Sequence, residues 1–270
     1  MMIGVSTRVL WAAEENLALN LDFVSKVADA AEMWMMPPFF PSWRQSQMKG
    51  DLDRLRDVLT TYDLETTIHA PSHDLNLSSL NPAAASCAVR EVEKCLEVAD
   101  LLGSKAVTFH PGKFRYQREK AYDALKGNLR RLDAQAKGRG CLLCVENMGK
   151  EGRFLITSDE IVDALSGLEN IRVTLDVAHL MLGAEGPSDF IGKLGPKIVH
   201  AHIADFKAAQ HAHLPLGQGG LDLVTPLREL KKAGYSGMFV MEGSSKNPHT
   251  SVPDDVKKLR GMLAAAGFGP

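Results

Sequence analysis

Six short segments of this chain have the composition of β-strands, and each ends in a residue that can bind a metal ion: His69, His110, Glu146, Asp176, His202 and Glu242. Helical patterns separate these segments, and such an alternation is typical of βαβ units around a parallel sheet. A closed parallel barrel brings the carboxyl ends of its strands to one mouth, so we expect the six side chains to converge there. The sequence therefore predicts a metal site built from residues that are distant along the chain.

The strand and helix patterns repeat eight times, which predicts an α/β fold of the (β/α)8 TIM barrel type. The expected strands are roughly Ile3 to Ser6, Glu32 to Met36, Thr66 to His69, Ala106 to His110, Leu142 to Glu146, Arg172 to Asp176, Ile198 to His202 and Phe239 to Glu242. The expected helices begin at side chains able to accept hydrogen bonds from first-turn amides, namely Asn20, Asp51, Asn81, Ser158 and Asp222. The chain has 270 residues and is 45% hydrophobic. These values favour a single domain over residues 1–270, with the active site at the carboxyl ends of the strands.

Charge and cysteine content narrow the classes of protein. Lys and Arg total 31 and Asp and Glu total 33, which gives a net charge of −2. The sequence also has no long basic run of the kind that is typical of nucleic-acid-binding proteins. The amino terminus enters a strand pattern with no basic segment followed by a long apolar one, so we expect a cytoplasmic protein that does not span a membrane. Cys141 and Cys144 form a C-x-x-C pair on one strand. Residues three apart on a strand point to opposite faces, so this pair is not expected to bind a metal.

The predicted ligands are imidazoles and carboxylates without thiolates, which suits zinc, manganese or a similar divalent ion. Carboxylates gathered at one mouth repel each other unless a cation lies between them. Further donors strengthen the prediction: His179 follows Asp176 by three residues, and an H-x-H pair, His211 and His213, lies in the loop after His202. Together these donors can hold one to three ions.

Seven stretches in order along the chain carry these residues: T-I-H-A-P-S-H-D-L-N-L (Thr67 to Leu77), T-F-H-P-G (Thr108 to Gly112), V-E-N-M-G (Val145 to Gly149), T-L-D-V-A-H (Thr174 to His179), H-A-H-I-A-D (His200 to Asp205), H-A-H-L-P-L-G-Q-G (His211 to Gly219) and M-E-G (Met241 to Gly243). This ordered set resembles the xylose isomerase-like TIM barrel superfamily. That superfamily includes the AP endonuclease family 2, or endonuclease IV type, as well as sugar and sugar-phosphate isomerases and epimerases.

The isomerase pattern of that superfamily implies one ion, held by Glu146, Asp176, His202 and Glu242. Glu146 and Glu242 would then exchange a proton with a carbon atom of a metal-bound sugar. His179 would polarise or hold a substrate oxygen.

The endonuclease pattern implies a two- or three-zinc cluster that cleaves DNA at abasic sites. It would place His69, His110 and Glu146 on a first ion. A second ion would be held by Glu146, Asp176, His202 and Glu242, and a third by His179, His211 and His213. In that family the first residue of the H-x-H pair is usually Asp, so His211 removes a negative charge from the third site.

Other residues are candidates for contacting a substrate. Lys113, Arg115 and Lys207 follow strand-end ligands closely and are placed to bind a phosphate or carboxylate. His200 lies two residues before His202 and so faces the same way, where it can orient a ligand or a substrate. Trp43 belongs to an aromatic loop that would either wall a small pocket or insert into a kinked duplex.

Between the two activities, the absence of a stripe of Lys or Arg favours a small sugar or sugar phosphate over DNA. The start Gly4-Val5-Ser6-Thr7 also differs from the G-A-H-V-S segment of endonuclease IV enzymes. We therefore expect a metal-dependent isomerase or epimerase, with DNA as the partner under the alternative.

Overall fold

The computed structural model of this chain describes residues 1–11, 13–37, 53, 55–149, 153–183, 185–207 and 212–269. Its centre is a closed barrel of parallel strands in the order β1-β10-β7-β6-β5-β4-β3-β2. The barrel strands are β1 (Ile3–Ser6), β2 (Ala30–Trp34), β3 (Glu65–His69), β4 (Ala106–Phe109), β5 (Leu142–Glu146), β6 (Ile171–Asp176), β7 (Ile198–Ile203) and β10 (Met238–Met241). The prediction of a (β/α)8 TIM barrel is confirmed.

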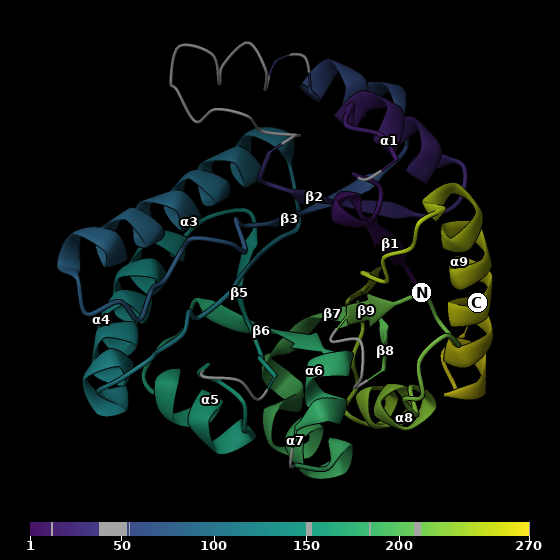
Figure 1. Cartoon of the computed structure of the whole chain (residues 1–270). Coiled ribbons are helices and arrows are strands. Elements are labelled where there is room, and N and C mark those ends of the chain that lie inside the picture. The colour runs from purple at the N-terminus through teal and green to yellow at the C-terminus, as the bar shows by residue number, and fades with distance from the viewer. Residues whose placement is uncertain are drawn as a thin grey trace.

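Helices surround this barrel (Figure 1). They are α1 (Leu17–Ser25), α3 (Pro82–Leu102), α4 (Arg118–Ala136), α5 (Ser158–Ala164), α6 (Val177–Leu182), α7 (Pro187–Leu194), α8 (Val224–Lys232) and α9 (Pro248–Ala265), with short 3-10 turns η1 (Thr7–Val9) and η2 (Gly195–Lys197). A small antiparallel hairpin of β8 (Asp205–Lys207) and β9 (Ala212–Leu214) follows β7. Within the described residues, every helix is too short or too polar to cross a bilayer.

The predicted helix starts are right in some places and wrong in others. The side chain of Asn81 accepts from the amides of the first turn of α3, and Asp222 does the same just before α8. The predicted start at Asn20 is wrong, because α1 begins four residues earlier behind an Asn16 cap. The cap of α5 is Thr157, one residue before the predicted Ser158. The predicted start at Asp51 lies outside the described residues.

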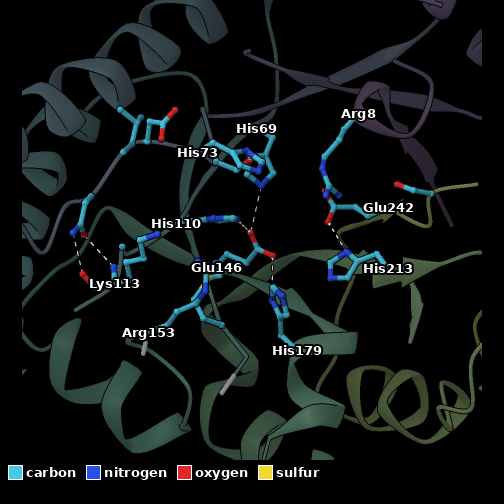
Figure 2. Close-up of a pocket in the computed structure, with 17 residues that line it drawn as sticks. Arg8, His69, His73, His110, Lys113, Glu146, Arg153, His179, His213 and Glu242 are labelled. Atoms are coloured by element: carbon cyan, nitrogen blue, oxygen red, sulfur yellow. Dashed lines mark hydrogen bonds and ion pairs between the residues drawn. The ribbon is translucent and has the colours of Figure 1, made fainter. Parts of the chain in front are cut away.

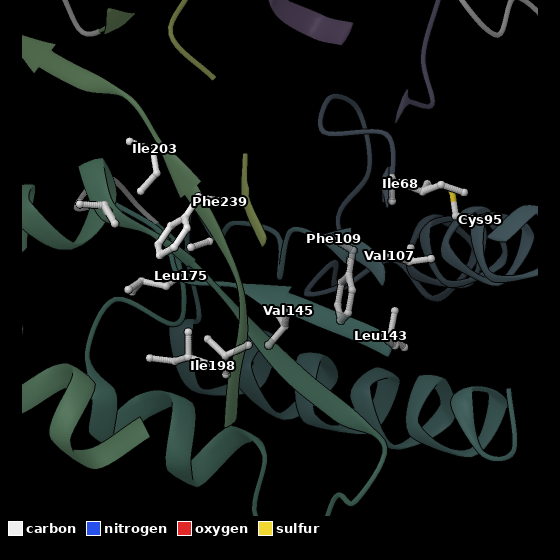
Figure 3. Close-up of a cluster of buried hydrophobic side chains, with 14 of the residues drawn as sticks. Ile68, Cys95, Val107, Phe109, Leu143, Val145, Leu175, Ile198, Ile203 and Phe239 are labelled. Carbon is white, nitrogen blue, oxygen red and sulfur yellow. The ribbon is translucent and has the colours of Figure 1, made fainter. Parts of the chain in front are cut away.

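The main apolar core lies between the barrel and the helices (Figure 3). Residues alternate along each strand, so one set points outward into this core while its neighbours point into the barrel. In β4 and β5 the outward set consists of Val107, Phe109, Leu143 and Val145, all fully or almost fully buried. Such packing against amphipathic helices provides most of the hydrophobic stabilisation of a fold of this class.

The interior of the barrel is polar toward its carboxyl end and apolar at its floor. The floor is a separate buried cluster of Ala30, Met238 and Val240. Above it, Thr108 and Thr174 share a hydrogen bond of 2.8 Å between their hydroxyl oxygens. Polar side chains inside a barrel must be paired or bind something, because burial without partners is costly.

Strand β2 departs from its predicted bounds in a way that matters for this interior. It runs from Ala30 to Trp34 instead of from Glu32 to Met36. Glu32 therefore lies in the middle of the strand, in register with Ser6 on one side and Thr67 on the other. Its carboxylate points into the barrel, where it is completely buried and accepts a hydrogen bond from the Thr67 hydroxyl at 3.1 Å.

Candidate metal centre and active site

The predicted ligands do converge at the mouth of the barrel (Figure 2). His69, Glu146 and Asp176 are the last residues of β3, β5 and β6, whereas His110 and Glu242 directly follow β4 and β10. A cavity of about 600 Å³ opens at this end, and its lining includes His69, His110, Glu146 and Glu242. The parallel barrel thus brings together side chains that are separated by up to 173 residues in the sequence, from His69 to Glu242.

The most compact group of donors contains Glu146, Asp176, His202 and Glu242. One ligand atom from each lies within 4.8 Å of every other, and all four residues are buried. His202 Nδ1 lies 3.4 Å from Glu146 Oε1 and 3.6 Å from Glu242 Oε2. Three carboxylates and an imidazole at this spacing form a typical donor set for a hard or borderline divalent cation.

A second group of donors meets the same glutamate from the other side. His110 Nε2 is 2.9 Å and His69 Nε2 is 3.4 Å from Glu146 Oε2. The three residues of the predicted first site are therefore brought together, with Glu146 between this group and the first.

A third group consists of Asp176, His179 and His213. Asp176 Oδ2 lies 3.5 Å from His179 Nδ1 and 3.8 Å from His213 Nε2. Asp176 Oδ1 accepts a 2.7 Å hydrogen bond from the backbone amide of His179, so this carboxylate also caps the first turn of α6. The predicted partner His211 lies outside the described residues.

The hydrogen bonding of His69 shows why these donors suit a cation. Its Nδ1 lies 2.7 Å from the carbonyl oxygen of Ala70 and must donate, because a carbonyl only accepts. In a neutral ring the lone pair of Nε2 then faces the carboxylate of Glu146, and two acceptors oppose each other. A proton on the ring or a metal ion between the two groups relieves this repulsion.

Four buried atoms of the three donor groups have no hydrogen bond within the described part of the chain. They are His110 Nδ1, Glu146 Oε2, Asp176 Oδ2 and His213 Nδ1. Buried polar atoms without partners are uncommon, and a bound ion or an ordered water is the usual explanation. The donor chemistry and these orphaned atoms together fit a resident divalent ion, whose ligands would come from the three groups above.

Opposite charges dominate the electrostatics of the site. Burial alone would raise the pKa of the Glu146 carboxyl, but the rings of His110 and His202 hold it well below its usual value. Burial would also raise the pKa of the Glu242 carboxyl, but the rings of His202 and His213 lower that pKa to about 2. Both carboxylates are therefore ionised at neutral pH, the form that binds metal and accepts protons.

Glu32 is a candidate site residue that the sequence did not reveal. Its Oε2 lies 2.8 Å from His200 Nε2, and its Oε1 lies 3.1 Å from His202 Nε2. Burial would raise the pKa of the Glu32 carboxyl, but the two rings hold it well below its usual value. The two-residue error in the bounds of β2 hid this residue, because it placed Glu32 at the start of the strand instead of in its middle, one layer below the strand-end ligands.

Of the residues predicted to contact a substrate, some line the cavity and others do not. Lys113 lines the cavity, whereas the exposed Arg115 and Lys207 are not among its described lining residues. His200 lies below the cavity, paired with Glu32. Trp43 lies outside the described residues. Three further basic residues of the lining, Arg8, His73 and Arg153, were not predicted as site residues; they lie in the segments that follow β1, β3 and β5.

One buried carboxylate holds the loop that carries His213. Asp205 accepts hydrogen bonds of 2.8 to 3.1 Å from the backbone amides of Phe206, Gly217, Gly219 and Leu221. Gly219 allows this approach, since a Cβ atom there would lie 2.2 Å from Asp205 Oδ1. These bonds tie residues 217–221 to the residue at the start of β8.

Asp205→Ala should destabilise the protein by on the order of 3 kcal/mol, because it leaves several amides without their acceptor. The measurement is urea denaturation followed by circular dichroism. The matched control is Asp222→Ala, which removes an exposed helix cap and should cost about 1 kcal/mol. Equal losses in the two variants would show that Asp205 does not anchor the loop.

Comparison with known proteins agrees with this fold. The family model described as xylose isomerase-like TIM barrel matches residues 21–263. The chain therefore belongs to the xylose isomerase-like TIM barrel family.

Two relatives and two solved structures illustrate the range of the family. The uncharacterized protein MJ1614 of Methanocaldococcus jannaschii is 27% identical over 96% of this chain and 99% of its own length. Fructoselysine 3-epimerase of Escherichia coli O157:H7 is 27% identical over 44% of each chain. A D-tagatose 3-epimerase-like protein superposes with a TM-score of 0.85 at 24% identity and 98% coverage of both chains. The IolI protein, solved with a bound zinc atom, superposes with a TM-score of 0.79 at 19% identity and 98% coverage of both.

Proposed function

We propose that this protein is a divalent-metal-dependent sugar or sugar-phosphate isomerase or epimerase. The observation that carries the proposal is the group of Glu146, Asp176, His202 and Glu242, whose donor atoms converge from four strand ends beside a cavity of suitable size. Zinc or manganese suits this set of imidazole and carboxylate donors.

When bound, the ion supplies Lewis acidity that makes the carbon next to a substrate carbonyl easier to deprotonate. The chain supplies the proton transfer. Glu146 and Glu242 belong to strands that are three apart in the barrel order, and both carboxylates line the cavity. One carboxylate can remove a proton from carbon while the other returns a proton from the opposite side, which inverts that carbon in an epimerase.

His179 is placed to hold a substrate oxygen at the wall of the cavity. Its Nδ1 lies 3.0 Å from the carbonyl oxygen of Asn147 and must donate to it. This bond fixes the tautomer of the neutral ring and leaves Nε2 as the atom for a substrate or an ion. The side chain of Asn147 in turn accepts from the backbone amide of Asp176 at 2.7 Å, so one residue orients two donors of the site.

The relatives support the same class of chemistry. Fructoselysine 3-epimerase resembles this chain in sequence, and the D-tagatose 3-epimerase-like protein resembles it in fold. The zinc atom in IolI is consistent with a resident metal in this family. The proposed two-glutamate mechanism is argued from the positions of Glu146 and Glu242, and the proposed choice of zinc or manganese is argued from the types of donor atom.

Transfer of deuterium from solvent tests the proposal directly. The protein loaded with Zn²⁺ or Mn²⁺ is incubated in D2O with D-fructose, D-tagatose and D-fructose 6-phosphate, and the carbon next to the carbonyl is followed by NMR. We expect deuterium incorporation together with an epimer or isomer, and we expect chelation of the metal to stop it. Absence of exchange with all three sugars, together with cleavage of a duplex that contains one abasic position, would assign the site to phosphodiester hydrolysis.

The second candidate function is phosphodiester hydrolysis at abasic sites in DNA. The presence of three donor groups supports it, because an endonuclease IV-type cluster needs more ligands than a single-ion isomerase. Under this alternative, up to three ions activate water and stabilise the oxygens of an in-line displacement. The number of ions per chain, measured by anomalous scattering, separates the two: one ion favours the isomerase and three favour the phosphodiesterase.

A further inference from the structure

We propose that Lys113 and Arg153 form a subsite for an anionic group, so that the substrate is a phosphorylated or carboxylated sugar and not a neutral one. This inference rests on the proposed isomerase or epimerase function and narrows its substrate. Both side chains line the cavity that also contains Glu146 and Glu242 (Figure 2).

The two cations are held side by side by the backbone. Lys113 follows β4 and Arg153 follows β5, and the two residues form an isolated antiparallel bridge. Residues paired in this way have Cα atoms about 4.5 to 5.5 Å apart. Loops from two neighbouring strands therefore present two cations at one place on the cavity wall.

The loop that carries Lys113 is fixed by side chains that follow β3. Asn76 binds both polar groups of the Lys113 backbone: its Oδ1 accepts from the amide at 3.0 Å and its Nδ2 donates to the carbonyl at 2.9 Å. Ser78 donates to the same carbonyl at 3.0 Å. Gly112 makes this approach possible, because its φ is +99° and a Cβ atom there would lie 2.2 Å from Asn76 Oδ1. A subsite whose backbone is ordered beforehand loses little entropy when it binds a ligand.

Both cations are available for a ligand. Among the described residues, neither Lys113 nor Arg153 forms an ion pair. Most of the Lys and Arg residues that do form ion pairs lie on the helices outside the barrel. A bound divalent ion would offset two of the three negative charges that the candidate ligands Glu146, Asp176 and Glu242 carry. Apart from those ligands, Asp74 is the one described acidic residue of the lining, against three cations. The wall therefore carries excess positive charge, which favours an anionic ligand.

The third cation, Arg8, belongs to a different part of the cavity. It follows β1, and β1 and β5 are four strands apart in both directions around the barrel. Figure 2 accordingly shows Arg8 on one side of the pocket and Lys113 with Arg153 on the other. The metal ligands lie between these sides. A sugar held at the ion can thus place a charged end against the paired cations while its reacting carbons stay at the two glutamates.

The test compares charged and neutral members of matched sugar pairs. The metal-loaded protein is titrated with D-fructose 6-phosphate against D-fructose and with D-tagaturonate against D-tagatose, and inorganic phosphate serves as a competitor. The wild type should bind at least one charged sugar about 10- to 100-fold more tightly than its neutral partner, as expected for charge-assisted hydrogen bonds. The pair that shows the difference tells whether the anion is a phosphate or a carboxylate.

Substitutions then locate the subsite. Lys113→Gln with Arg153→Gln should remove most of the preference for the charged sugar, measured as the ratio of the charged-sugar affinity to the neutral-sugar affinity, at the metal content of the wild type. The matched control is Arg115→Gln, an exposed cation in the same loop that does not line the cavity. Equal affinity of the wild type for charged and neutral sugars would overturn the proposal, as would a loss of preference in the control as large as in the double variant.

The outcome also separates this proposal from the proposed function. Deuterium exchange with neutral sugars alone would refute the anionic subsite and leave the isomerase or epimerase intact. Conversely, phosphate binding that is lost in the double variant, without exchange in any sugar, would refute the proposed function and leave an anion site in place. Metal content and circular dichroism of each variant show that the fold is retained.

Discussion

Glu242→Gln is expected to lower the rate of sugar isomerisation or epimerisation by about 10²- to 10⁴-fold, and Glu146→Gln should do the same. The substitution keeps the shape of the side chain but removes the group that accepts a proton, and general acid–base catalysis contributes factors of this size. The measurement is turnover, together with deuterium exchange, at a metal concentration high enough to compensate for any loss of affinity.

Asp74→Asn provides the control for these two variants. It neutralises a carboxylate of the same cavity that belongs to none of the three donor groups. We expect a far smaller effect than for either glutamate. Turnover at the wild-type rate in Glu146→Gln and Glu242→Gln, with metal bound, would remove both residues from the mechanism.

Glu32→Gln is expected to weaken metal binding by about 10- to 100-fold, the usual effect of removing a carboxylate that orients a metal-binding histidine. Glu32 binds Nε2 of His202 and so turns Nδ1 of the same ring toward Glu146 and Glu242. It cannot reach the substrate cavity itself, since it is not among the lining residues that the structure describes. Metal affinity is measured by competition with a chromogenic chelator.

Thr108→Val is the matched control for Glu32→Gln. It removes a buried hydroxyl from the barrel interior whose hydrogen-bond partner, among the described residues, is the hydroxyl of Thr174 and not a candidate ligand. Metal affinity close to that of the wild type is expected. If Glu32→Gln binds metal as tightly as this control, then the orientation of His202 does not depend on Glu32.

The sequence predicts the barrel and most of the ligand set because both depend on regular spacing. A strand has a period of two residues, so a strand-end ligand such as Glu146 or Asp176 also reveals which neighbours point inward. The eight-fold alternation then brings the strand ends together without any knowledge of side-chain contacts.

Features that depend on irregular backbone could not be predicted in the same way. Glu32 was missed because the predicted bounds of β2 were shifted by two residues. Such a shift leaves the same residues pointing into the barrel but changes how deep in the barrel each of them lies. Arg153 was missed because its place depends on a single bridge to Lys113 across two loops, and loops have no periodicity to read. For the same reason Lys113 and Arg115 looked equivalent in sequence, whereas only Lys113 faces the cavity.

The apolar floor of the barrel, formed by Ala30, Met238 and Val240, has a consequence for how such a protein can diversify. The proposed ligands for the ion come from strand ends above this floor, and the cations proposed to select a substrate come from the loops beyond them. Exchange of the loop residues would then alter which molecule is accepted without changing either the ion or the barrel beneath it. In this arrangement the residues that determine specificity lie in the loops, and the residues that carry the reaction lie at the strand ends. New substrates can then be acquired by substitutions in the loops alone.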